Sequence, residues 1–427
     1  MAAERTMVTE RTACVVPALP HEILCHVLDL ACGLRELYTA SRVCRSWSAA
    51  AARARDRRRV LQLVGSHRPA RGKMRYPCAI AKVPYTVPGA DDFVISEEKR
   101  LVHYVTSASS SLLIPHGPPL RSWIKPPRGS TGPSGLAIHA PPVSPNAAAR
   151  TLELFVSDTG RDVCTHAIAP HGLASGHWPV ENEFGGFGTA PGMFIGPADL
   201  CVSSSDGLLL VAEVCTISAF HLPSLSFAYK VGSRGSGPGA FRGVSGLDVC
   251  NGEVYVCDSL NHRIQVLRAD GGSLVRAFGG KGDAPGLFRK PASIAVVDMD
   301  APGIQPAHLA PRQPAHLSPR LAVAARERAS RVGVRVIVGE TTGKRVQVLS
   351  AHGSPLQLVS TLALPPAAID PHDEEHRGQA MGGAAPPARI ACFAVDAARQ
   401  RVYAANASAN ARLYVWQLLL PVHVQPQ

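Results

Sequence analysis

The chain has 427 residues, of which 38 are Gly and 36 are Pro; 46% of the residues are hydrophobic, but only 5% are aromatic. Gly and Pro together exceed their average usage of about 12%, which argues against long helices and favours short strands joined by tight turns. Because no run of about 18 apolar residues occurs, we expect no membrane span and no membrane partner. The short apolar stretch near the N-terminus has acidic neighbours, so we expect neither a secretory signal nor a transit peptide.

The net charge is +12, from 44 Lys and Arg residues against 32 Asp and Glu residues, and only 8 of the 44 cations are Lys. A basic chain can bind nucleic acid or an acidic partner, but the excess of Arg over Lys also fits a compositional bias of the coding sequence, which we favour. Eleven Cys without any C-x-x-C pair show no zinc spacing and cannot all form disulfides. We expect reduced thiols, no metal and no cofactor in a cytoplasmic or nuclear protein.

Residues 1–18 are expected to be disordered, and residues 19–59 predict a different kind of unit. After Pro20 this segment has almost no Gly or Pro, and its apolar residues recur at helical spacing. Gly33 is placed to end a first helix, a second begins at Leu34, and the segment from Val43 to Trp47 lies near its end or in a third. Three short helices make too small a core to be robust alone, so this module needs a partner surface.

The module resembles an F-box, with LPHEIL at 19–24 and VCRSW at 43–47, and the separation of the two motif halves is within one residue of the family's usual spacing. The segment between its first two helices, ACGLREL, lacks the Asp-Pro common in the family. The resemblance implies a hydrophobic face that docks on the Skp-type adaptor of a cullin–RING ubiquitin ligase; the alternative is a helical cap on the next domain. The adaptor-binding residues that it implies are Leu19, Pro20, Ile23, Leu24, Val27, Leu28, Val43, Cys44 and Trp47.

Two short segments follow the module. The basic run RARDRRR at 53–59 is interpreted as the solvated end of the last helix, with a nuclear-localisation patch as the less favoured alternative. The apolar run VLQLVG at 60–65 is predicted to be a strand that closes the following domain by pairing with its last repeat.

Three similar segments begin at Gly185, Gly232 and Gly279, which are 47 residues apart. Each contains a P-G-x-F motif and continues into strands, the second of which ends in an acid: Glu213, Asp258 or, after an insertion, Glu340. Related units occur at 133–158 and 391–406, and a less complete one at 93–114. A period of 40–50 residues with about four strands predicts a β-propeller of six blades, with five as the alternative. The Phe is expected to wedge between neighbouring blades.

The segment DSLNHRIQVL at 258–267 resembles an NHL repeat, and the resemblance extends over roughly 125–420. It implies a mainly β, six-bladed NHL-type propeller preceded by the small three-helix F-box, without implying one activity. From the residues alone, Asp258, Asn261 and Arg263 predict a hairpin lock, because Asn and Asp bond nearby backbone and Arg can pair with the acid. We favour this lock over direct ligand contact.

The predicted propeller spans 60–420 and is followed by a short tail, 421–427. Two Pro- and Ala-rich insertions, at about 300–332 and 366–388, interrupt it; the first contains the tandem octads PAHLAPRQ and PAHLSPRL. Such low-complexity duplication is typical of solvated, disordered loops. We expect both insertions to leave the same rim of the propeller.

The order of the domains predicts the substrate-recognition subunit of a cullin–RING (SCF-type) ubiquitin ligase, which captures an unknown target and has no catalytic residue. A cluster of cations in corresponding loops favours an acidic or phosphorylated target. Alternatives are an RNA-binding or protein-scaffolding propeller with a helical cap and, least favoured, a metal-dependent propeller enzyme. The candidate substrate-binding residues are Arg161, His262, Arg263, Lys344, Arg345 and Arg412.

Overall fold

The computed structural model describes Leu28, residues 34–40, Arg42, Trp47 and residues 50–51, and then 61–69, 74–83, 91–97, 100–106, 112–115, 132–141, 151–173, 180–299, 333–342, 345–360, 390–408 and 411–419. The chain divides into two compact units, Met1–Arg58 and Arg59–Gln427. The first unit contains the helix α2 (Leu34–Ala40), which begins where the sequence predicts a second helix. Among its described residues, the buried side chains are those of Leu28, Leu37, Ala40, Ala50 and Ala51.

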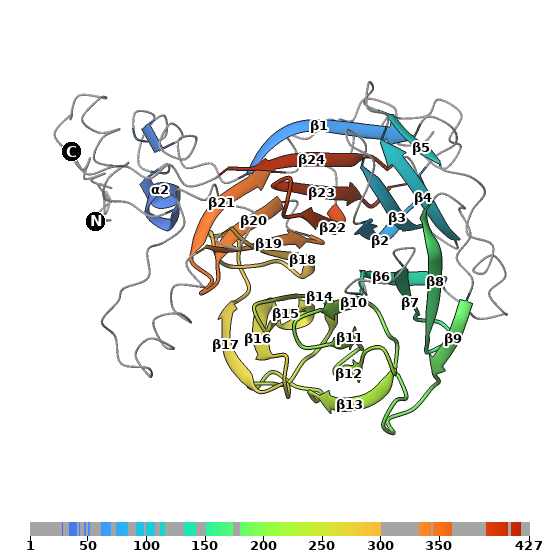
Figure 1. The fold of residues 1–427 in the computed structure, drawn as a ribbon. Coiled ribbons are helices and arrows are strands. Elements are labelled where there is room, and N and C mark those ends of the chain that lie inside the picture. Colours follow the sequence, from blue (N-terminus) through green and yellow to red (C-terminus); the bar gives the residue numbers. More distant parts are fainter. Residues whose placement is uncertain are drawn as a thin grey trace, which may run out of the picture. The chain divides into compact units, whose positions relative to one another are not determined.

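The second unit is a β-propeller, and its described strands form six four-stranded antiparallel blades around a central axis (Figure 1). The six blades confirm the number predicted from the sequence and exclude the alternative of five blades. We number the blades along the chain and list the strands of each from the innermost outwards. The first blade contains β2 (Pro77–Lys82), β3 (Asp92–Glu97), β4 (Arg100–Thr106) and β5 (Leu112–Pro115); the second contains β6 (Pro133–His139), β7 (Leu152–Asp158), β8 (Val163–Leu173) and β9 (Val180–Gly185); and the third contains β10 (Leu200–Ser203), β11 (Leu208–Ala212), β12 (Ile217–His221) and β13 (Ser226–Val231). The fourth blade contains β14 (Val244–Cys250), β15 (Glu253–Asp258), β16 (Arg263–Arg268) and β17 (Leu274–Gly279); the fifth contains β18 (Pro291–Asp298), β19 (Val334–Glu340), β20 (Arg345–Ser350) and β21 (Pro355–Ser360); and the last contains β22 (Ile390–Asp396), β23 (Arg401–Asn406), β24 (Leu413–Leu418) and β1 (Leu61–Pro69).

The ring is closed by β1, which comes first in the chain but completes the last blade. It pairs antiparallel with β24, from Leu61 opposite Leu418 to His67 opposite Leu413. The strand predicted at 60–65 is thus confirmed. The far end of β1 also pairs in parallel with β5, which joins the last blade to the first in one eight-stranded sheet. Opening the ring between the last and the first blade therefore requires breaking the pairing of β1.

A buried ionic network reinforces this junction between the first and last blades. Asp91 is buried, and it accepts a hydrogen bond of 2.7 Å from the Tyr403 hydroxyl and pairs with the guanidinium groups of Arg399 and Arg401. The ammonium group of Lys82 lies 3.2 Å from Asp396 on the last blade. The network thus links β2 and the start of β3 to β22 and β23.

The Phe of each P-G-x-F motif lies between neighbouring blades, as the sequence predicts. Phe194, Phe241 and Phe288 are fully buried, and Phe241, for example, packs among side chains of β11, β12, β14 and β15. The outer strand ends in a Gly with positive φ, such as Gly185, where a Cβ atom would lie 2.3 Å from the Phe194 ring. Only Gly combines this backbone conformation with so close an approach.

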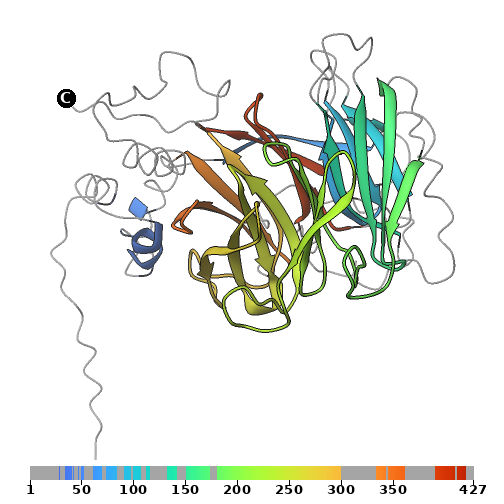
Figure 2. The same cartoon turned by 60° about the horizontal axis from the view of Figure 1, so that its bottom comes forward.

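Neighbouring strands of a blade run in opposite directions, and all of them extend between the two rims of the ring (Figure 2). The turn after the second strand and the loop after the fourth strand therefore lie at the same rim, which we call the Gly-Phe face because it carries the P-G-x-F loops. The expectation that both insertions leave one rim is wrong. The strand ends flanking the first, Asp298 and Val334, lie at the opposite rim, whereas those flanking the second, Ser360 and Ile390, lie at the Gly-Phe face.

The innermost strands of the six blades line a central channel of about 520 Å³. Two carboxylates in its wall bridge neighbouring blades: Asp199 accepts the Leu247 N–H at 3.0 Å and Asp248 accepts the Val296 N–H at 2.7 Å. Burial raises the pKa of Asp199 to about 6 and that of Asp248 to about 7, against the opposing effect of these hydrogen bonds. Blade-to-blade contact is thus polar on the inside and apolar around the Phe rings.

The raised pKa of Asp248 predicts a pH-dependent stability. The folded carboxyl group holds its proton up to a higher pH than the unfolded one, so its contribution to the free energy of unfolding falls as the pH rises from about 4 to about 7. Between pH 5 and pH 8, the Tm of the full chain should decline less in Asp248→Asn than in the wild type. Asp270→Asn, at an exposed position, is the control and should follow the wild type; equal slopes in all three proteins would contradict the assignment.

The Asp91 network predicts a second stability effect. Asp91→Ala leaves the buried Tyr403 hydroxyl without its acceptor, which should cost about 1–3 kcal/mol, and the ion pairs that it removes add little because their Arg side chains are partly exposed. Urea titration of the full chain should show this loss. Asp283→Ala removes an exposed ion pair and should leave the midpoint unchanged; a loss of similar size in both variants would disprove the closing role of Asp91.

Candidate functional site

Of the nine residues that the F-box resemblance assigns to adaptor binding, the structure describes two, Leu28 and Trp47. Leu28 is fully buried in the small core, and Trp47 packs half-buried against that core. An aromatic ring in this position can contribute to the fold and still offer apolar area to a partner. The other seven residues lie outside the described part of the chain: Leu19, Pro20, Ile23, Leu24, Val27, Val43 and Cys44.

In the propeller, a polar side chain stands at the end of the second strand of every blade. In four blades it is a fully buried carboxylate: Glu97 in the first blade, and Glu213, Asp258 or Glu340 in the three blades with a P-G-x-F loop. Each of the last three accepts the backbone N–H of the residue after the P-G-x-F Phe, and the donors are Ile195 at 2.9 Å, Arg242 at 3.0 Å and Arg289 at 2.8 Å. The carboxylate therefore fastens the Gly-Phe loop to its blade.

The predicted hairpin lock is confirmed in the fourth blade. The Asp258 carboxylate accepts hydrogen bonds from Asn261 at 2.8 Å and from Nε of Arg263 at 2.9 Å. Arg263 also reaches beyond the hairpin, because its Nη2 donates to the carbonyl groups of Gly237 and Ala240 in the preceding Gly-Phe loop. The lock and the loop thus form a single hydrogen-bonded unit.

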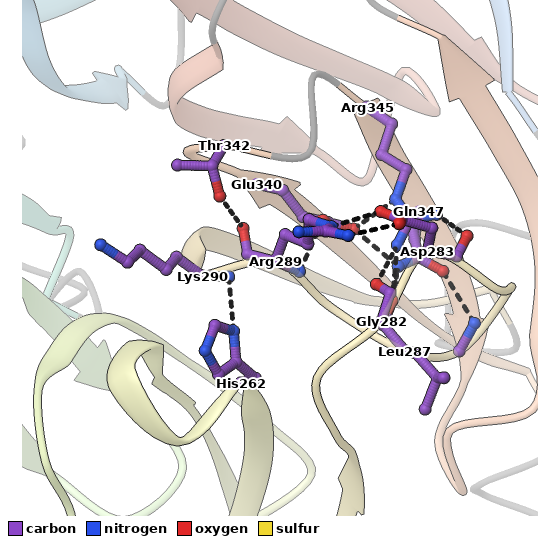
Figure 3. Close-up of polar contacts among 11 residues, drawn as sticks. His262, Gly282, Asp283, Leu287, Arg289, Lys290, Glu340, Thr342, Arg345 and Gln347 are labelled. Atoms are coloured by element: carbon purple, nitrogen blue, oxygen red, sulfur yellow. Dashed lines mark hydrogen bonds and ion pairs between the residues drawn. The ribbon is translucent and has the colours of Figure 1, made fainter.

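The same arrangement recurs one blade later (Figure 3). Nε of Arg345 donates to Glu340 at 2.7 Å and its Nη2 donates to the Leu287 carbonyl at 2.7 Å. Gln347 adds two contacts to this arrangement: its side-chain amide group donates to Glu340, and its side-chain carbonyl accepts the Gly286 N–H at 2.9 Å. Gln265 makes the matching contact in the fourth blade. The shared R-x-Q-V-L strand, visible in the sequence, is the signal for this loop clamp.

The third blade obtains its cation from another strand. Glu213 has no Asn or Arg after it in the sequence, but Lys230 of β13 lies 3.0 Å from its carboxylate and donates to the Met193 carbonyl at 2.7 Å. Ser218 adds a hydrogen bond of 2.6 Å to Glu213. Sequence spacing within the hairpin cannot reveal Lys230, because it comes from the fourth strand of the blade.

The candidate substrate-binding residues are spread around the Gly-Phe face rather than gathered. Arg161, in the second blade, forms a bidentate pair with Glu183, and Arg412, in the last blade, has a buried Nε without a partner among the described residues. The guanidinium groups of Arg263 and Arg345 are engaged inside the protein. Lys344 lies outside the described residues.

His262 is the candidate with the most distinctive surroundings. It adopts a left-handed conformation with φ of 57°, and its Nδ1 accepts the Lys290 N–H at 3.1 Å (Figure 3). Its pKa is lowered, first by burial and then by the nearby charges of Lys281, Lys290 and Arg289. Sequence reasoning missed these three cations, although they frame the GDAPGLF segment of the third repeat.

Neither a metal centre nor a membrane segment emerges from the part of the chain that the structure describes. Within it, no group of three or more His, Cys, Asp or Glu side chains is arranged to hold a metal ion. Nor is any helix there sufficiently long and apolar for a membrane crossing.

The clamp predicts a stability cost that separates buried from exposed ion pairs. Arg345→Met leaves the Glu340 carboxylate buried without its cation and should lower the free energy of unfolding by about 3 kcal/mol. Arg161→Met removes a largely exposed pair and should cost about 1 kcal/mol or less. The double variant Arg345→Met, Glu340→Gln should recover part of the loss in urea titrations; equal losses in the two single variants would rule out the clamp.

Family models match both units. Residues 16–61 match the F-box-like model, and residues 241–267 match the NHL repeat model. The second match runs from the wedged Phe241 through the hairpin lock of Asp258 and Arg263 to the end of the R-x-Q-V-L motif at Leu267. No curated protein matches the chain. The chain thus contains an F-box-like domain, followed by a six-bladed β-propeller in which residues 241–267 form an NHL repeat.

Proposed function

We propose that this protein is the substrate-recognition subunit of a cullin–RING (SCF-type) ubiquitin ligase. The observation that carries the proposal is the F-box-like domain at residues 16–61, joined to a separate, closed propeller. F-box domains generally bind Skp-type adaptors, and a propeller offers a broad face to a target. The protein would act by proximity, because holding a target beside a ubiquitin-conjugating enzyme raises its effective concentration.

We also propose that the chain performs no chemistry of its own. The buried carboxylates Glu213, Asp258 and Glu340 are occupied by loop and cation contacts. Burial raises the pKa of the thiol groups of Cys164, Cys201, Cys257 and Cys392, and a thiol with a raised pKa is a poor nucleophile. The cysteines that the structure describes are free, which supports a reducing compartment, the cytoplasm or nucleus.

Adaptor recruitment can be tested by affinity capture from cell extract. The full-length chain should recover a Skp-type adaptor and a cullin on immunoblots, and Leu24→Ala, Trp47→Ala should lose both. A chain that begins at residue 60 retains the closing strand β1 and should keep the Tm of the propeller while losing the adaptor. Failure of the wild-type chain to recover either protein would contradict the proposal and leave residues 16–61 as a helical cap.

A further inference from the structure

We propose that the Gly-Phe face binds an extended acidic peptide segment that carries a large apolar side chain, on a surface formed by the loops around blades three, four and five. This inference rests on the proposed function, because it specifies the chemistry of the target that the propeller would hold. The surface has an apolar part and a basic part, and each consists of exposed side chains on rigid loops.

The apolar part is a band of five exposed side chains. Phe187 is 79% exposed, and the others are between 37% and 51% exposed. Contacts bring parts of the band together: the Val214 N–H donates to the Ile195 carbonyl, and the Val244 N–H, next to Gly243 beneath Leu260, donates to the Val214 carbonyl. An exposed, contiguous apolar patch commonly marks an interaction site. The members of this apolar band are Phe187, Met193, Ile195, Val214 and Leu260.

The basic part arises because equivalent loop positions change character around the ring. Three residues occupy the same position in their loops, because the backbone of each forms an isolated β-bridge with the wedged Phe of that loop. They are Phe187, Arg234 and Lys281. The residues directly after those Phe rings, Ile195, Arg242 and Arg289, form a second equivalent set. In both sets the first loop carries an apolar residue and the next two carry cations. The basic group defined in this way, with Lys290 added, is Arg234, Arg242, Lys281, Arg289 and Lys290.

Most of this basic group has no acidic partner in the part of the protein that the structure describes. Arg289 pairs with Asp283, but Arg234, Arg242, Lys281 and Lys290 are exposed. Asp283 is the only exposed acid among the described residues of the loops 232–243, 259–263 and 279–290. The pKa of His262 is lowered first by burial and then by Lys281 and Lys290, so the charge of these two cations acts on this part of the surface. Such a surface attracts negative charge.

The two parts adjoin at Leu260. A Cβ atom on Gly243 would lie 3.2 Å from Cγ of Leu260, so this apolar side chain packs over the residue directly after Arg242. A peptide can therefore place an apolar side chain on the band while its acidic residues face the basic group. The loops are held by the carboxylate and Gln clamps described above, so little ordering is required on binding.

An acidic peptide fits this surface better than single-stranded RNA. RNA would satisfy the cations with its phosphates, but binding of single strands also relies on stacking of bases against aromatic rings. The apolar band offers one aromatic ring, Phe187, and four aliphatic or thioether side chains. Aliphatic surface beside cations instead suits Leu, Met or Phe flanked by Asp and Glu.

The test uses the full chain and pools of labelled twelve-residue peptides. One pool contains a single Leu or Phe among Asp and Glu residues, and a matched pool replaces the acids by Asn and Gln; pooled single-stranded RNA is the third probe. We expect the acidic pool to bind most tightly, with an affinity that falls as salt is added. Arg242→Glu, Lys281→Glu and, separately, Val214→Ser, Leu260→Ser should each weaken binding by about tenfold or more.

A matched control variant, Arg268→Glu, Leu274→Ser, alters the same residue types at the opposite rim and should bind within about twofold of the wild type. Absence of binding, equal binding of the neutral pool, tighter binding of RNA, or equal weakening by the control would each overturn the inference. Adaptor capture is scored on the same variants: if the wild type binds acidic peptides but recovers no adaptor, the proposed function fails alone; if the adaptor is recovered without peptide selectivity, only this inference fails.

Discussion

The buried carboxylate at the end of the second strand is the contact on which much of the propeller depends. In three successive blades it accepts the backbone N–H of the residue after the P-G-x-F Phe, which fixes the loop and, through it, the Phe ring between two blades. A buried negative charge is costly unless it is compensated. The cation and amide groups around the carboxylate thus stabilise the fold, and their positions determine the geometry of the Gly-Phe loop.

The three blades compensate the buried carboxylate in two ways. The fourth and fifth blades use an Arg and a Gln on the third strand, whereas the third blade uses Lys230 on the fourth strand and Ser218. The cations at the centre of the clamp, Arg263 and Arg345, are therefore committed to the interior. Cations on the loop surface, where no carboxylate is buried, remain available for a partner.

The sequence predicted the features that follow from local patterns. The 47-residue repeat indicated a propeller, and the acid-to-Arg spacing at Asp258 indicated the hairpin lock. Even the distant pairing of residues 60–65 with the last blade could be anticipated, because a ring needs a closing strand. Lys230 could not be found, because its partner lies in a different hairpin. The contacts of Arg263 and Arg345 with carbonyl groups of the preceding Gly-Phe loop were also hidden, since a sequence does not show which loop lies within reach of a guanidinium group.

The closing strand has a consequence for the way this protein is made. β1 is synthesised early, but its antiparallel partner β24 emerges only about 350 residues later, which at typical rates of 5–20 residues per second is roughly 20–70 s. During that time the growing chain has an unpaired edge strand, which is prone to pair with other chains. A chain that terminates before residue 413 would retain residues 16–61 and yet never close its ring. Premature termination would therefore yield a molecule that keeps the F-box-like domain but lacks an intact propeller.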